Sequence, residues 1–134
     1  MGKLNNTGEL YRIIKRSKPD TIKRRNGKVI GISSALFKDE EGVSVDQKKE
    51  RSENEAINGL KNFFGSRLKG VVSLLESDVA DAEAVLIPKP SKNLPYHAEI
   101  HKNYDEILLD DVQALQLADS CNLILFDEDL AWTK

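Results

Sequence analysis

The chain has little that could cross-link it or place it in a membrane. Its single cysteine, Cys121, excludes a disulfide within these 134 residues. No apolar run approaches the roughly 18 residues that a membrane-spanning helix needs. The first ten residues lack the apolar stretch of a secretory signal, and Asn6 stands where a myristoylation signal requires Ser or Thr. These absences predict a soluble, cytoplasmic protein.

Motifs with established chemistry are also missing. The chain has no phosphate-binding loop of the form G-x-x-x-x-G-K-[ST], no G-x-G-x-x-G, no cysteine cluster for a metal and no G-x-S-x-G elbow. Cys121 precedes an apolar run and has no neighbouring base, so we expect a buried structural thiol rather than a nucleophile. The sequence therefore indicates no cofactor.

The composition that is present is typical of one globular domain. Hydrophobic residues make up 40% and charged residues 31% of the chain, which is ordinary for a folded protein, and the length suits a single core. We expect residues 1–8, which are mostly polar, to form a flexible N-terminus, and residues 9–134 to form a single domain.

Hydrophobic periodicity predicts an α+β fold. Short strands are expected at 10–14, 43–45, 71–75, 84–87 and 123–126, with a hairpin turn at Asn26-Gly27. A helix is expected over 53–68, because Ser52 and Glu55 form a capping box and Ile57, Leu60 and Phe64 recur on one face. A second helix after Asp110 should turn Val112, Leu115 and Ala118 inward. The whole predicts a mixed or antiparallel sheet of about five or six strands with two main helices.

Charge is distributed unevenly along the chain. Residues 1–30 carry nine basic and two acidic side chains, whereas residues 75–134 carry four basic and thirteen acidic ones. Clustered cations at Lys23, Arg24, Arg25 and Lys28 favour contact with a macromolecular partner, either a nucleic acid or a protein. The alternative is a solvated hairpin that balances the acidic C-terminal half.

The segment His97-Ala98-Glu99-Ile100-His101 contains both histidines of the chain. On a strand, His97, Glu99 and His101 share one face, and the two imidazoles lie too far apart to bind one metal ion readily. On a helix, His97 and His101 would be neighbours, and a metal site would be feasible. His97 and Glu99 could also form an acid–base pair, with Arg12 holding an anionic substrate. The alternative is a set of solvated side chains.

Two resemblances extend this interpretation. The order of Arg12, Ser33 and Glu99 loosely resembles the layout of ADP-ribosyltransferases, which implies binding of a nicotinamide dinucleotide by these three residues. The pieces LYR, SALFK, GVSVD and HAEI together resemble a group of small uncharacterised bacterial proteins. That resemblance implies a bacterial or phage setting and no defined activity, and it adds Lys38 and Ser44 to the candidate binding residues.

Two functional hypotheses follow. The first is a non-catalytic accessory or binding protein that contacts a macromolecular partner, protein or nucleic acid, through its basic N-terminal segment. The second is a small enzyme that uses His97 and Glu99 with Arg12, by acid–base, metal-assisted or ADP-ribosyltransferase-like chemistry.

Overall fold

Six antiparallel strands form the main sheet of the computed structural model, which describes residues 8–133. Their order across the sheet is β6 (Val85–Pro88), β7 (His97–His101), β4 (Val43–Gln47), β1 (Glu9–Lys15), β5 (Leu68–Leu75) and β8 (Asn122–Phe126). A second, two-stranded sheet pairs β2 (Ile22–Arg25) with β3 (Lys28–Ile32). The predicted α+β class is confirmed. Apart from Gly8, the expectation of a flexible N-terminus lies outside the described residues.

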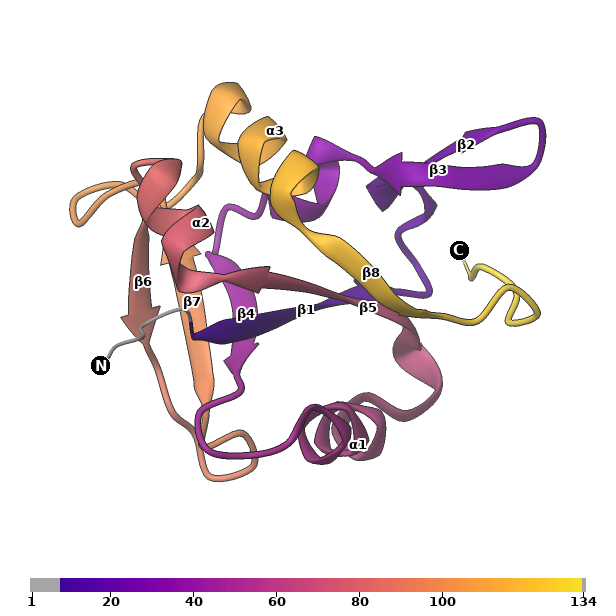
Figure 1. Ribbon diagram of the computed structural model, residues 1–134, viewed down its shortest axis with the longest axis horizontal. Helices are drawn as coiled ribbons and strands as arrows, with labels where there is room; N and C mark the ends of the chain where they lie inside the picture. The colour runs from indigo at the N-terminus through magenta and orange to yellow at the C-terminus, as the bar shows by residue number, and fades with distance from the viewer. Residues whose placement is uncertain (1–7, 134) are drawn as a thin grey trace.

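Helices cover both faces of the main sheet (Figure 1). On one face, α1 (Glu53–Phe64) packs Ala56 and Leu60 against Tyr11 and Ile13 of β1. On the other face lie α2 (Glu76–Asp81), α3 (Asp111–Ser120) and the short 3-10 helix η3 (Ser34–Phe37). Two further 3-10 turns are η2 (Pro19–Thr21) and η4 (Gly65–Arg67). Because side chains alternate along a strand, neighbouring residues of β1 belong to two separate cores.

The start of α1 is as predicted, but its end is not. The Ser52 hydroxyl accepts the Glu55 amide at 3.1 Å, and the Glu55 carboxylate accepts the Ser52 amide at 2.9 Å, which completes the capping box. The predicted helix ran to Leu68, whereas α1 ends at Phe64. Gly65 adopts a φ of +55°, and Leu68 instead begins β5, where it pairs with Lys15.

The inward face of α3 also differs from the prediction. Val112 and Leu115 are 72% and 46% exposed, whereas Ala114 and Leu117 are fully buried. Only Ala118 of the three predicted residues lies in the core. The helix begins at an Asp110 cap as expected, so the error is in the choice of face, which the surrounding elements η3 and β3 decide. Among residues 8–133, no helix is both long and apolar enough to cross a membrane.

Candidate functional site

The β2–β3 hairpin carries its cations on one face. Asn26 and Gly27 take up φ angles of +52° and +80°, which suits the predicted two-residue hairpin turn. One face of the ribbon packs against the main core, where Ile22 and Ile32 lie buried opposite each other. The other face consists of Lys23, which is opposite Gly31, and of Arg25 opposite Lys28; we call these three cations the outer face of the hairpin. Figure 1 shows this hairpin extending away from the main sheet.

Arg24 differs from these three cations because it is engaged within the protein. Its guanidinium contacts the Glu128 carboxylate at 2.8 Å and donates to the Gly27 carbonyl at 2.8 Å. The hydrogen bond to Glu128 raises the pKa of Arg24. Arg24 therefore ties the hairpin to the acidic C-terminal segment. The side chains of the outer face form no ion pair within residues 8–133.

Lys38 and Ser44 have internal roles as well. The Lys38 ammonium forms an ion pair with Asp111 in the first turn of α3. Ser44 lies in β4 directly opposite Glu99 of β7, and its backbone carbonyl accepts a hydrogen bond from Arg12. Neither residue belongs to the hairpin surface, so the predicted set of binding residues does not form one patch.

Arg12 lies inside the protein on the side of the sheet that faces η3. Arg12 as a whole residue is only 8% exposed. Its side chain donates from Nε to the Leu36 carbonyl at 3.0 Å and from Nη1 to the Ser44 carbonyl at 3.1 Å. No carboxylate of residues 8–133 lies within ion-pairing distance. Burial lowers the pKa of Arg12 to about 10, an effect that the charge of Asp39 partly offsets. Arg12 is thus a buried cation held by carbonyl groups alone.

The two histidines lie on strand β7, so the helical alternative is wrong. Ala98 and Ile100 are fully buried in the core beside α3, which places His97, Glu99 and His101 on the opposite face of the sheet, as predicted for a strand. Glu99 contacts His101 at 2.8 Å (Oε1 to Nε2) and not His97. The expected pairing of His97 with Glu99 is therefore replaced by a pairing of Glu99 with His101.

Lys89 completes this cluster on the α1 side of the sheet. Its ammonium lies 3.2 Å from Glu99 Oε1, and its carbonyl lies 2.9 Å from His97 Nδ1. Burial alone would raise the pKa of Glu99, but the hydrogen bonds from His101 and Lys89 outweigh it, and the pKa is lowered. Within residues 8–133 there is no group of three or more His, Cys, Asp or Glu side chains arranged to hold a metal ion.

The structure does not bring Arg12 together with His97 and Glu99. Arg12 points to the face of η3, whereas His97 and Glu99 point to the face of α1. Ser33, the third residue of the ADP-ribosyltransferase-like set, accepts the Ala35 amide at 3.1 Å and caps η3. A site shared by Arg12 and Glu99 would have to pass through the sheet.

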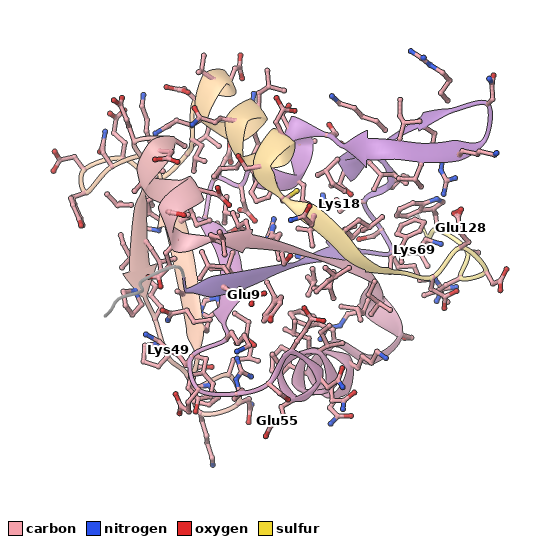
Figure 2. All side chains as sticks on the ribbon, in the orientation of Figure 1. Glu9, Lys18, Lys49, Glu55, Lys69 and Glu128 are labelled. Atoms are coloured by element: carbon pink, nitrogen blue, oxygen red, sulfur yellow. The ribbon has the colours of Figure 1, made fainter. Side chains whose placement is uncertain are left out.

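Two lysines with specific contacts were missed by sequence reasoning. Lys89 sits in a proline-rich stretch that gave no sign of its contact with Glu99. Lys69 in β5 is 2% exposed; it donates to the carbonyls of Asp127 and Leu130 and lies 4.8 Å and 5.0 Å from the ring centres of Phe126 and Trp132. Figure 2 shows Lys69 and Glu128 at the end of the molecule where the C-terminal segment lies. Alternating hydrophobicity could not single out a lysine whose partners are backbone carbonyls.

Cys121 shows no sign of reactivity. It is half-buried against the main core and its thiol donates to the Ala118 carbonyl at 3.3 Å. Burial raises the pKa of Cys121 to about 11, so the thiolate is scarce at neutral pH. This agrees with the interpretation of a structural thiol.

Comparison with protein-family models, with curated protein sequences and with solved structures gave no match to this chain.

Proposed function

We propose that the protein is a non-catalytic accessory protein that binds nucleic acid through the outer face of its hairpin. The observation that carries this proposal is the pairing of Arg25 with Lys28 directly across the two strands. Like charges at opposite positions destabilise a β-ribbon, and no carboxylate of residues 8–133 pairs with Lys23, Arg25 or Lys28. An arrangement that weakens the hairpin thus lies next to its turn, where the hairpin projects from the main sheet (Figure 1).

Phosphate groups would relieve this repulsion. A two-stranded ribbon fits the major groove of a duplex, and each lysine or arginine that contacts a phosphate releases condensed counterions. Three such contacts predict that log K falls with log[salt] with a slope of about −2.7. Binding of this kind is independent of sequence and modest in affinity, which suits an accessory protein.

Arg24 supports this role indirectly. Its ion pair with Glu128 at 2.8 Å anchors the hairpin to the C-terminal segment, so that the opposite side of the ribbon is left for a partner. Because Arg24 has this structural function, its replacement would disturb the hairpin itself. The informative substitutions are those at exposed positions without internal contacts, Lys23 and Arg25.

The experiment is a titration of a fluorescein-labelled 20-base-pair duplex, followed by anisotropy at several salt concentrations. We expect Lys23→Glu/Arg25→Glu to weaken binding by more than about tenfold and to reduce the salt slope by about 2. The matched control is Lys61→Glu/Lys92→Glu, which reverses two exposed charges on α1 and on the loop after β6 and should leave the affinity nearly unchanged. Equal losses in both variants would refute the proposal.

A second arm separates nucleic acid from acidic protein. Polyglutamate with the same total negative charge as the duplex has neither the groove nor the phosphate geometry of a duplex. We expect wild-type protein to prefer the duplex; if polyglutamate competes equally well, the partner is an acidic protein surface instead. The proposal further includes a bacterial or phage origin and a cytoplasmic location, and these rest on the sequence pattern alone.

A further inference from the structure

The main sheet divides beside Arg12. Strands β1 and β4 pair only at Leu10–Gln47 and Tyr11–Asp46, while β4 continues along β7 as far as Val43. Beyond Tyr11 the two strands separate, and the Arg12 guanidinium spans the gap by donating to the Ser44 carbonyl. A pocket of about 480 Å³ opens at this point, bounded by β1, η2, η3 and the turn after η3. Its volume is within the range of small-molecule sites.

Arg12 forms the inner end of this pocket with part of its hydrogen-bonding capacity unused. A guanidinium has five N–H donors in a planar fork, and two of its three nitrogens, Nε and Nη1, are engaged by carbonyls. The second terminal nitrogen has no partner among residues 8–133. A buried charge is costly unless it is paired, and the carbonyl dipoles do not neutralise this one. Since the pKa of Arg12 is lowered only to about 10, the side chain is still a cation at neutral pH.

Charges of both signs line the pocket. Lys15, Lys18 and Asp20 are exposed on the side of β1 and η2, and Asp39, Glu40 and Glu41 form an acidic rim in the turn after η3. Lys38 also lines the pocket, but its ammonium is already paired with Asp111. The rim is ordered, because the Asp39 carboxylate accepts the Glu41 amide at 2.9 Å. Such a lining disfavours a polyphosphate, which the three carboxylates would repel. It favours a molecule with one anionic group and, a few ångströms away, a positive one.

We propose that this pocket binds a small zwitterion, with its carboxylate or phosphate on the free edge of Arg12 and its ammonium group against the Asp39–Glu41 rim. Arginine suits the inner position because Nη2 and the N–H of Nη1 that Ser44 does not use can together bind a carboxylate or phosphate through two parallel hydrogen bonds. The site is separate from the outer face of the hairpin and does not depend on nucleic-acid binding. Its ligand would supply an anion in direct contact with Arg12, whereas Asp39 acts on Arg12 through its charge without forming an ion pair.

A purely structural role for Arg12 makes different predictions. If the guanidinium only joins the Leu36 and Ser44 carbonyls, the pocket should bind no anion in preference to another. Substitutions in the acidic rim should then leave binding unchanged. The two roles are separated by ligands that differ in a single group. O-phosphoethanolamine and ethyl phosphate share the phosphate and differ in the ammonium; β-alanine and propionate share the carboxylate and differ in the same way.

The experiment is isothermal titration of the full chain with each of these four compounds. We expect one zwitterion to bind saturably and at least about fivefold more tightly than its partner without the ammonium; which pair responds distinguishes phosphate from carboxylate. Arg12→Lys should weaken this binding by about tenfold or more, because a lysine cannot form the paired hydrogen bonds. Lys23→Glu/Arg25→Glu should bind as the wild type does, since the hairpin is not involved.

A second variant keeps the test decisive if Arg12→Lys does not fold. Glu40 and Glu41 are exposed, so Glu40→Gln/Glu41→Gln should fold normally, retain binding of the anionic group and lose the preference for the zwitterion. The proposal is overturned if none of the four compounds binds with a Kd below about 1 mM. It is also overturned if the rim variant keeps the full preference, or if a folded Arg12→Lys variant binds as tightly as wild type.

Discussion

Gly42 makes room for the contact between Glu99 and His101, and its replacement by alanine is the sharpest test of that cluster. Gly42 precedes β4 with a φ of +105°, a conformation that residues with a side chain rarely adopt. A Cβ atom at this position would lie 2.5 Å from Glu99 Oε1 and 3.0 Å from His101 Nε2. Both the backbone and the space therefore require glycine.

The cost of Gly42→Ala has two parts. The unfavourable backbone conformation costs about 1–3 kcal/mol. The carboxylate of Glu99 must also move, and it is held by His101 at 2.8 Å and by Lys89 at 3.2 Å with its side chain only 13% exposed. Weakening those hydrogen bonds adds about 1 kcal/mol. The sum predicts a loss of roughly 2–4 kcal/mol in the free energy of unfolding, a large share of the stability of a small domain.

Urea denaturation followed by circular dichroism measures this loss. The cycle comprises wild type, Gly42→Ala, Glu99→Ala and the double variant, and we expect the cost of Gly42→Ala to fall by about 1 kcal/mol when Glu99 is absent. Gly31→Ala is the control, because a Cβ there meets nothing within 4 Å and its cost should stay below about 1 kcal/mol. A loss below about 1 kcal/mol for Gly42→Ala would refute the reasoning. An equal loss with and without Glu99 would refute the steric part alone.

Two further predictions concern other charged contacts. Because the pKa of Glu99 is lowered in the folded protein, its charge stabilises the fold above the unfolded-state pKa of about 4.3. The stability difference between wild type and Glu99→Gln should therefore shrink as the pH falls below that value, and urea midpoints at several pH values measure it; a constant difference contradicts the assignment. Lys69→Met should release the C-terminal segment and shift the fluorescence of Trp132, the only tryptophan, to longer wavelength. Lys61→Met should leave the emission unchanged, and an unchanged spectrum in Lys69→Met would show that Lys69 does not hold the segment.

Features that depend on neighbouring residues were predictable from the sequence. The capping box of α1 needs only Ser52 and Glu55 three positions apart, and both of its hydrogen bonds are present. The hairpin turn needs only Asn26 and Gly27, which take up the required positive φ angles. The exposure of Lys23 follows from its residue type, since an unpaired lysine is almost never fully buried.

Features that depend on distant contacts were not predictable. The apolar stripe of α1 extends in sequence to Leu68, yet that residue pairs with Lys15 in the sheet, because backbone pairing outweighs helix propensity there. On α3, Val112 and Leu117 are equally apolar, but only Leu117 meets the core. Sequence periodicity identifies an amphipathic helix and leaves its orientation to the elements around it.

The prediction that Arg12 shares a site with His97 and Glu99 was wrong for a similar reason. Alternation along β7 correctly grouped His97, Glu99 and His101 on one face, and alternation along β1 separated Arg12 from Tyr11. Strand β4 lies between β1 and β7 in the sheet. Neither pattern indicates whether the polar residues of β1 and those of β7 lie on the same face of the sheet. The register of β4 with β1 and with β7 decides this, and it places Arg12 and Glu99 on opposite faces.

Charge compensation within the protein separates the structural residues from the candidate functional ones. Arg24, Lys38 and Glu99 each have an oppositely charged partner, so their contacts are explained by the fold itself. Arg12 has none within residues 8–133, and neither does the outer face of the hairpin. A fold gains nothing from leaving a buried cation unpaired or from placing two like charges across a ribbon. These are therefore the positions at which the proposed ligands would stabilise the protein. At the exposed outer face of the hairpin, substitution should affect binding more than folding.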